Sequence, residues 1–301
     1  MANLPNNNFT TNTLSLHAGY EYDRQRTLSV PIYQSTAYSF ENAEQAAARF
    51  SLEELGNIYS RLTNPTVDML AKRIAAVEGG AFGVATASGS SAVFYSLVNL
   101  AQNGDNIAYS NKIYGGSQTL LVHVLKRFGI EGRVFDIDNL SSLEKIIDDK
   151  TKAIFFESLS NPQIAIADVE TITNIAKKHK IVTICDNTVA TPILFRPFDF
   201  GVDVSVHSLT KYINGHGSGL GGAVIEREGL NELIKDNSRY PAFNTPDESY
   251  HGLIYANLPL PIFSIRILIE WLRNIGASLS PQNAWIHFQG LETLELRIQK
   301  H

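Results

Sequence analysis

Residues 153–186 decide the fold: the stretch opens with Ala153-Ile-Phe-Phe-Glu157 and closes with Ile181-Val-Thr-Ile-Cys-Asp186. Both ends are short apolar runs typical of buried strands, and a helical segment fits between them over 168–179. Two strands joined by a helix form a crossover unit, which favours parallel pairing in one sheet. The stretch therefore predicts an α/β fold.

The same alternation continues on both sides of this stretch. Apolar runs predict seven strands in all, at residues 82–87, 107–110, 133–136, 153–157, 181–185, 202–206 and 221–225. Helical segments fit between several of them, near residues 90–101, 116–128, 140–149 and 168–179. Because ligands of open α/β sheets bind at the carboxyl ends of the strands, chemistry is expected in the loops that follow the strands.

The flanking regions have a different character. The beginning of the chain is polar and irregular, apart from a short helical patch around Ala46. Asn64, Pro65 and Gly79 mark the start and the end of a helix. After about residue 257 the pattern becomes helical. We therefore expect an N-terminal arm over 1–58, an α/β domain over 59–257 and a helical link over 258–301.

The composition excludes several functional classes. Of the 301 residues, 44% are hydrophobic and only 18% are charged, which favours a folded core over a disordered chain. The net charge of −5 argues against a nucleic-acid binder. The single cysteine, Cys185, excludes an intrachain disulfide and a cysteine-rich metal cage, and we expect no metal. With no signal segment and no membrane span apparent, the sequence predicts a soluble cytoplasmic protein.

The segment from His207 to Gly222 contains more candidate functional residues than any other part of the sequence. Its glycines satisfy the pattern G-x-G-x-x-G, but they run into a predicted strand, whereas a dinucleotide-binding loop must open a helix. Lys211 follows a strand and lies between Ser208 and Thr210. Such a lysine could form a Schiff base with a carbonyl compound, and the alternative is a surface lysine in a glycine turn.

Three further loops carry candidate residues. Ser88, Gly89 and Ser90 lie between a strand and a helix, where backbone N–H groups favour a phosphate or simply cap the helix. Asp186 ends an apolar strand, where its carboxylate could pair with a protonated ring nitrogen or cap the next turn. Tyr114 precedes two glycines and is either a stacking ring or a half-buried core tyrosine. Together with Lys211, these residues lie at four strand ends.

Three motifs resemble one known family. Phe155-Phe-Glu-Ser-Leu-Ser-Asn-Pro162, Val182-Thr-Ile-Cys-Asp-Asn-Thr188 and Ser205-Val-His-Ser-Leu-Thr-Lys211 are similar to the Cys/Met-metabolism enzymes that use pyridoxal 5′-phosphate (PLP). The resemblance runs from about Leu14 to the end of the chain. It implies the fold-type I, aspartate aminotransferase-like architecture of PLP-dependent transferases, with a seven-stranded mostly parallel sheet, in agreement with the seven strands read from the sequence.

The resemblance also implies the catalytic residues. Lys211 would hold PLP as a Schiff base and then move protons, and Asp186 would keep the pyridinium nitrogen protonated so that the ring accepts electrons. Tyr114 would stack on the ring, and Asn161 and Thr188 would line it.

The remaining cofactor contacts implied by the resemblance concern the phosphate. They are Ser88, Gly89, Ser90, Ser208 and Thr210 from the same chain, and Tyr59 and Arg61 reaching into the phosphate site of a neighbouring subunit. A guanidinium suits that task because it can bind a phosphate through two parallel hydrogen bonds. The implied assembly is a homotetramer built from dimers that share active sites.

Two segments resemble one subgroup, the O-acetylhomoserine sulfhydrylases: Phe50–Tyr59 and Arg239–Leu253. The reaction implied is γ-replacement, in which O-acetyl-L-homoserine and sulfide give L-homocysteine and acetate, a step of methionine and cysteine biosynthesis. The alternatives are cystathionine γ-synthase and methionine γ-lyase. In the latter the tyrosine loop typically has a cysteine where this chain has Gly116.

The family also implies an arginine for the substrate carboxylate, in a small C-terminal domain that follows the helical link. The chain as given ends at His301, at what resembles the entry to that domain, so a PLP-binding remnant without turnover remains the non-enzyme alternative. Arg273 and Arg297 lie in helical patterns and are expected to be surface or interface charges.

Overall fold

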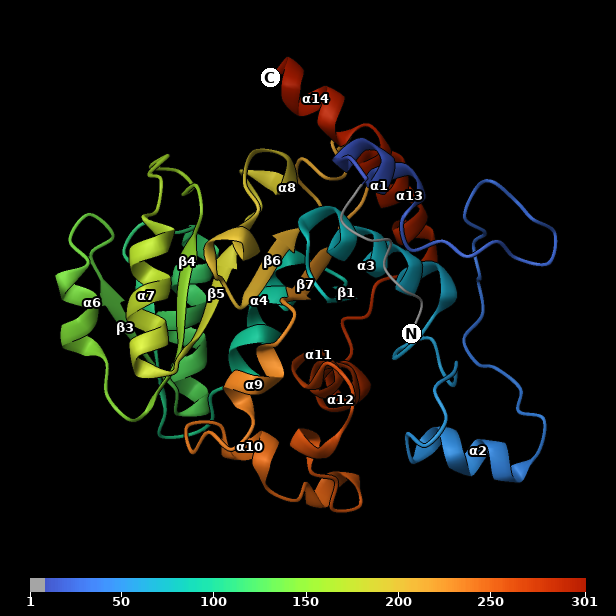
Figure 1. Ribbon diagram of the computed structural model, residues 1–301, viewed down its shortest axis with the longest axis horizontal. Coiled ribbons are helices and arrows are strands. Elements are labelled where there is room, and N and C mark those ends of the chain that lie inside the picture. The colour runs from blue at the N-terminus through green and yellow to red at the C-terminus, as the bar shows by residue number, and fades with distance from the viewer. Residues whose placement is uncertain (1–8) are drawn as a thin grey trace.

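The computed structural model describes residues 9–301, so the first eight residues of the expected arm lie outside the described residues. Its centre is one seven-stranded sheet with the order β1-β7-β6-β5-β4-β2-β3 (Figure 1). The strands are β1 (Phe82–Thr86), β2 (Asn106–Ser110), β3 (Glu131–Phe135), β4 (Thr151–Glu157), β5 (Val182–Asp186), β6 (Val204–Ser208) and β7 (Gly222–Glu226). All seven predicted strands are confirmed within two residues at each end.

The sheet is mostly parallel, as predicted. β2 pairs in parallel with β3 and β4, β4 with β5, and β5 with β6, whereas β7 is antiparallel to both β1 and β6. The connection from β6 to β7, residues 209–221, contains no helix. Parallel strands need a crossover, usually through a helix, so this irregular connection instead returns the chain in the antiparallel direction.

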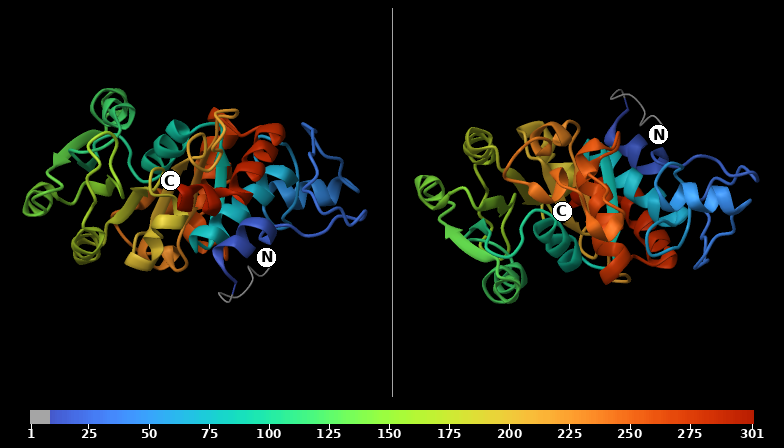
Figure 2. Two further views of the ribbon diagram at one scale, coloured as in Figure 1. Left: turned by 90° about the horizontal axis from the view of Figure 1, so that it is seen from above. Right: turned by 90° about the horizontal axis from the view of Figure 1, so that it is seen from below.

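Helices cover both faces of the sheet (Figure 2). They are α1 (Thr11–His17), α2 (Ala43–Phe50), α3 (Pro65–Glu78), α4 (Gly89–Val98), α5 (Gly115–Thr119), α6 (Ser141–Ile146), α7 (Val169–His179), α8 (Thr191–Leu194), α9 (Leu230–Ile234), α10 (Pro241–Asn244), α11 (Ile262–Arg266), α12 (Arg273–Ile275), α13 (Pro281–Glu292) and α14 (Leu294–Lys300). α4 and α11 pack on the core at one face, and α3, α6, α7 and α13 pack on the cores at the other.

The helix predicted after Asn64 shows how local sequence determines α3. The Asn64 side chain accepts a hydrogen bond from the backbone N–H of Thr66 at 3.0 Å, and Pro65 occupies the first turn. Gly79 ends the helix with a φ of +83°, a conformation that glycine adopts without steric cost. Leu70 and Ile74 are fully buried, so one stripe of α3 packs against the sheet.

The helix predicted over 116–128 is not continuous. α5 is followed by a π-helical turn over 120–124 and a 3₁₀ turn over 125–128, and Gly129 ends the segment with a φ of +75°. The prediction was right about a helical crossover and wrong about a regular α-helix. The beginning of this segment carries Tyr114 and Gly116, so the irregularity begins one turn after the candidate residues.

Residues near the end of the chain contribute to the hydrophobic cores on both faces of the sheet. Phe263 of α11 is buried in the core beside α4, and Phe288 and Leu291 of α13 are buried in the core beside α3. The helices after residue 258 therefore complete the packing of the sheet. The domain boundaries at residues 58 and 257 stay predictions.

The segment between α1 and α3 projects from the sheet and its helices (Figures 1 and 2). Apart from α2, the regular structure described for it is one isolated β-bridge between Ala37 and Tyr59. Large apolar side chains are exposed along it, including Leu28 and Leu55. In the described part of the chain, no helix is both long and apolar enough to cross a membrane.

Candidate active site

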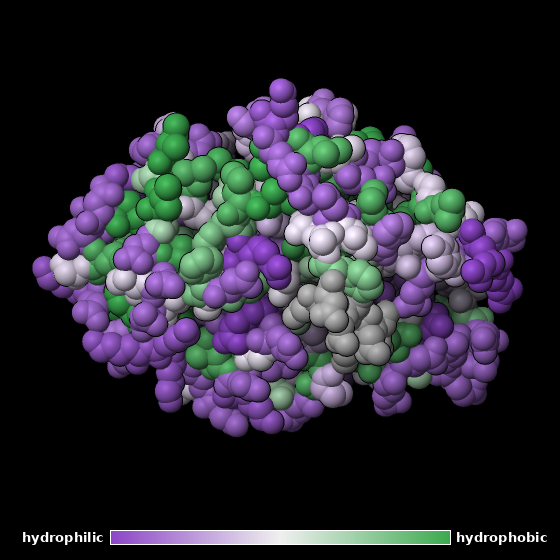
Figure 3. Space-filling view, turned by 45° about the horizontal axis from the view of Figure 1, so that its top comes forward, coloured by the Kyte–Doolittle hydropathy of each residue, from purple (hydrophilic) through white to green (hydrophobic). Residues whose placement is uncertain are grey.

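The candidate residues follow the ends of β1, β2, β4, β5 and β6. Of these, β4, β5 and β6 are neighbours in the sheet and end at the top of the molecule in Figure 1. Glu157 is the register partner of Asp186, and Asp186 that of Val206, two residues before Ser208. Figure 3 brings this edge forward and shows apolar residues exposed on this face. Ile164 after β4, Leu194 of α8 after β5 and Leu220 before β7 are exposed. The edge thus combines polar strand ends with an apolar rim.

Asp186 is fixed by its neighbours on β5 and β6. Its Oδ1 accepts a hydrogen bond from the backbone N–H of Thr188 at 3.0 Å. The hydroxyl of Thr188 in turn accepts one from the backbone N–H of Ser208 at 2.8 Å. Burial raises the pKa of the Asp186 carboxyl, although the bonds from Thr188 oppose the shift. A cation placed against this carboxylate would offset the cost of burying its charge.

The start of α4 forms a cradle closed by two glycines. Ser88 caps the helix in a capping box with Ser91, which leaves the first-turn N–H groups of Gly89 and Ser90 directed out of the helix end. A Cβ atom on Gly89 would lie 2.8 Å from the Cα of Ser208, and one on Gly222 would overlap the carbonyl of Ser88. Only glycine permits this approach, and the resulting cradle suits an anion.

The two residues that flank Lys211 on the N-terminal side have different surroundings. Ser208 ends β6 beside the cradle, and it is only partly buried. The hydroxyl of Thr210 accepts a hydrogen bond from the backbone N–H of Gly221 at 3.1 Å and lies 3.3 Å from the Gly221 carbonyl. Thr210 therefore closes the Lys211 loop in addition to any contact with a ligand.

Lys211 is exposed and lies in a turn that α14 anchors. Gly215 donates its backbone N–H to the carbonyl of Lys211 at 2.8 Å. Arg297 donates to the carbonyl of Tyr212 at 2.7 Å and to that of Ile213 at 3.3 Å. The expectation that Arg297 is a surface or interface charge was therefore wrong: it is partly buried and satisfies carbonyls of the turn that carries Lys211. Nothing in its helical spacing could reveal partners about 85 residues away.

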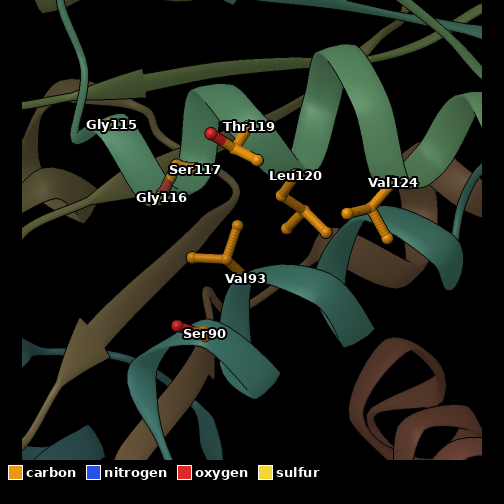
Figure 4. A pocket seen from close by; sticks show the side chains of 8 residues that line it. All are labelled: Ser90, Val93, Gly115, Gly116, Ser117, Thr119, Leu120 and Val124. Atoms are coloured by element: carbon orange, nitrogen blue, oxygen red, sulfur yellow. The ribbon is translucent and has the colours of Figure 1, made fainter.

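Tyr114 immediately precedes α5 at its N-cap position, and it is half exposed. A Cβ atom on Gly116 would overlap this ring, so the absence of a side chain at Gly116 lets the ring fold back over the helix start. A pocket of about 370 Å³ lies between α4 and α5, next to Ser90 and Gly116. Figure 4 shows Val93 of α4 and Leu120 across this pocket from each other.

Glu157 joins these loops and received no role from the sequence. Its Oε1 accepts the backbone N–H of Tyr114 at 2.7 Å, and its Oε2 accepts that of Asn161 at 2.9 Å. Burial, together with the negative charge of Asp186, raises the pKa of Glu157 to about 8. The signal that singled out Asp186, a carboxylate at the end of an apolar strand, applies equally to Glu157.

A second buried carboxylate, that of Glu78, binds polar side chains near the ends of β5 and β6. Glu78, the last residue of α3, is fully buried and accepts hydrogen bonds from the side chains of Asn187 and Ser205, both at 2.9 Å. Its carboxylate also pairs with the ring Nε2 of His207 at 2.8 Å. Asn187 follows Asp186 and His207 precedes Ser208, so this cluster ties the ends of β5 and β6 to α3.

Tyr59 and Arg61 stand apart from this group. The Arg61 guanidinium lies 5.0 Å from the centre of the Tyr59 ring, and both side chains are exposed. They belong to the projecting segment at the right of Figure 1. The structure therefore places Ser88, Gly89, Ser90, Tyr114, Asn161, Asp186, Thr188, Ser208, Thr210 and Lys211 at or after strand ends of one sheet, whereas Tyr59 and Arg61 are exposed on the projecting segment.

The donor set of the strand ends fits PLP. The anion cradle suits the phosphate, and the half-buried carboxylate suits the ring nitrogen. The aromatic face of Tyr114 suits the ring, and the exposed lysine amine suits the carbonyl carbon. Within residues 9–301, no group of three or more His, Cys, Asp or Glu side chains could hold a metal ion.

The chain is similar to known proteins over nearly its whole length. It is 44% identical to the O-acetyl-L-homoserine sulfhydrylase of Corynebacterium glutamicum, covering 96% of this chain and 67% of that protein. It is 41% identical to the O-acetyl-L-homoserine sulfhydrylase 1 of Thermus thermophilus, covering 96% of this chain and 69% of that protein. The chain thus spans about two thirds of the length of these relatives.

Solved structures agree. A putative O-acetylhomoserine (thiol)-lyase from Campylobacter jejuni, which carries N′-pyridoxyl-lysine-5′-monophosphate, is 69% identical with a TM-score of 0.97, covering 98% of this chain and 73% of that one. The cystathionine γ-lyase of Lactobacillus plantarum, solved with L-serine, is 31% identical with a TM-score of 0.76, covering 96% of this chain and 65% of that one. These similarities confirm the PLP-dependent fold type I read from the sequence. The family of Cys/Met metabolism PLP-dependent enzymes matches residues 12–301, and the chain belongs to that family.

Proposed function

We propose that the protein catalyses γ-replacement, in which O-acetyl-L-homoserine and sulfide give L-homocysteine and acetate in methionine and cysteine biosynthesis. The observation that carries the proposal is the placement of Lys211, Asp186 and the α4 cradle after β6, β5 and β1, with Gly89 packed against Ser208. The sulfhydrylases of Corynebacterium and Thermus support the choice of substrate, since they are 41–44% identical to this chain over the aligned residues.

The cofactor residues divide by chemistry. Gly89, Ser90 and Ser208 would hold the phosphate at the start of α4, with Ser88 and Thr210 shaping the cradle. Asp186 would face the ring nitrogen, held in place by Thr188, and Tyr114 would cover one face of the ring beside Asn161. When bound, PLP supplies a carbonyl carbon that condenses with amines and a ring that takes up the electron pair released at Cα.

Lys211 has the role of proton carrier. Its amine would accept the proton from Cα of the substrate and then move a proton at Cβ, so that acetate departs from Cγ and sulfide adds there. The turn around Lys211 is held by Gly215 and Arg297, which limits the positions from which the amine can approach. The carboxylate of Asp186 would stabilise the positive charge of the protonated ring nitrogen at every step of the reaction.

The working assembly that we propose is a cytoplasmic homotetramer built from dimers that share active sites. Tyr59 and Arg61 support it, because both are exposed on the projecting segment. Arg61 would then bind the phosphate held by the other subunit. The one cysteine, Cys185, is free and buried, as suits a reducing compartment.

The test is an assay of homocysteine and acetate formed from O-acetyl-L-homoserine and sulfide, with Lys211→Arg as the matched control. The arginine keeps the positive charge, but its guanidinium does not lose a proton under these conditions and cannot replace the amine. We expect turnover that needs PLP and falls by about 10³-fold or more in the control. Equal activity of Lys211→Arg, or formation of cystathionine from cysteine in place of homocysteine from sulfide, would contradict the proposal.

A further inference from the structure

Glu157 occupies a position equivalent to that of Asp186 on the neighbouring strand. The two are register partners at the ends of β4 and β5. Side chains alternate between the faces of a strand, and Phe155 and Ile184 both belong to the core beside α4. Glu157 and Asp186, two residues further along their strands, therefore lie on that same face, which also carries Tyr114 and the α4 cradle.

The carboxylate of Glu157 connects two separate loops. One oxygen accepts the backbone N–H of Tyr114, 43 residues earlier in the chain, and the other accepts the backbone N–H of Asn161. The side chain is only 5% exposed, so water does not compete strongly for these bonds. Hydrogen bonds to an ionised acceptor are about twice as strong as bonds between neutral groups.

We infer that Glu157 is a positioning residue of this active site, whose carboxylate holds the backbone of Tyr114 and Asn161 against the strand end that carries Asp186. The inference rests on the proposed cofactor site. Glu157 itself would contact neither the cofactor ring nor the substrate. It fixes the backbone positions from which the side chains of Tyr114 and Asn161 extend. Asn161 and the glycines after Tyr114 are exposed, so the Glu157 bonds hold loop positions that are otherwise open to solvent.

The charge of Glu157 supports this role. Both of its oxygens accept N–H groups, and these two bonds favour the ionised form and oppose the rise in pKa that burial and Asp186 cause. A cation bound at Asp186 would relieve the repulsion between the two carboxylates. Binding of the protonated ring at Asp186 and closure of the Glu157 contacts therefore favour each other.

The chain contains a matched control for a merely structural carboxylate. Glu226 ends β7 as Glu157 ends β4, is 2% exposed and has a pKa raised to about 7 by burial. Its Oε2 accepts the backbone N–H and the hydroxyl of Ser264, both at 2.7 Å. Ser264 belongs to α11 and none of the candidate residues contacts this pair in the described chain. Glu226→Gln therefore removes a buried charge without touching the site.

The experiment compares Glu157→Gln with Glu226→Gln in the full chain, with and without PLP. Amide hydrogen exchange is measured at Tyr114 and Ser264, PLP affinity by absorbance titration of the cofactor-free protein, and kcat and KM separately on the loaded enzyme. We expect Tyr114 exchange about 10-fold faster, PLP affinity about 10-fold weaker and kcat lowered more than KM is raised in Glu157→Gln, from the loss of one charged hydrogen bond. In Glu226→Gln only Ser264 exchange should rise.

Unchanged exchange at Tyr114 in Glu157→Gln, or an equal loss of PLP affinity in both variants, would overturn the inference. If Glu157→Gln does not fold, Glu157→Asp takes its place, because it keeps the charge but is one methylene too short to reach both loops. The same direction of change is expected, and the same results would overturn it. Exchange and PLP binding do not require sulfhydrylase turnover, so inactive wild-type protein with the expected exchange pattern would count against the proposed reaction only.

Discussion

Asp186 and Arg61 are proposed to serve the same kind of cofactor site, yet the chain holds them in opposite ways. Asp186 is partly buried at the end of a central strand, and Thr188 and Glu157 surround it with fixed polar groups. Arg61 is exposed on a projecting segment whose one described bridge is Ala37 to Tyr59, and it contacts the Tyr59 ring. The strand ends are organised within one chain, whereas the projecting segment presents side chains outward, as a residue that serves another subunit must.

The largest effect is expected at the strand ends. Asp186→Asn removes the charge but keeps the size and the contact with the N–H of Thr188. Loss of such an electrostatic partner should cost about 3 kcal/mol in the barrier, or on the order of 10²-fold in kcat, while PLP still binds. Steady-state kinetics and the absorbance of bound PLP measure the two separately. Near-normal kcat in this variant would show that the strand-end carboxylate does not stabilise the ring charge.

A smaller effect is expected from the projecting segment. Arg61→Ala should weaken PLP binding by about 10-fold, since it removes charge-assisted hydrogen bonds to the phosphate. Mixed with Lys211→Ala subunits, it should regain activity above that of either parent, because one site in each mixed dimer then contains both native residues. Activity assays on verified mixed oligomers make this measurement. If activity does not recover, Arg61 serves its own chain and the contrast between the two regions fails.

The smallest effect is expected at Gly116. A Cβ atom there would overlap the Tyr114 ring, so Gly116→Ala must displace the ring while leaving Glu157 and the Tyr114 backbone in place. Because displacement of a side chain from its preferred rotamer costs about 1 kcal/mol, we expect a loss of roughly fivefold in kcat/KM with little change in Tm. Gly115→Ala is the control, since a Cβ atom at Gly115 meets open space. Equal losses in both variants would mean that ring position is not the cause.

The fold could be predicted from the sequence because its signals are local. Apolar runs and caps lie within a few residues of each other, and they predicted all seven strands and α3. The antiparallel placement of β7 could not be read in this way, because it depends on a connection without a helix and on pairing with β1, about 140 residues earlier. The break after α5 was missed for a similar reason, since apolar spacing does not distinguish α-helical from π-helical turns.

The site could be predicted where chemistry coincides with a strand end, as at Asp186 and Lys211. Glu157 carries the same signal, but its role depends on backbone N–H groups of two loops that only the folded chain brings to it. The carbonyl partners of Arg297 were missed, because the helical spacing of an arginine is the same whether its side chain faces solvent or donates to distant carbonyls. Local patterns thus indicate which residues reach the site edge, but not which groups hold them there.

The most direct test of the account is to locate the lysine that binds PLP. The purified protein is loaded with PLP and reduced with borohydride, which makes a Schiff base permanent, and the labelled peptide is identified by mass spectrometry. The account predicts a single phosphopyridoxyl label on Lys211, absent from Lys211→Ala. A label on another lysine, such as Lys112 beside the Tyr114 loop, or no label at all, would contradict the assignment of the strand ends as the PLP site.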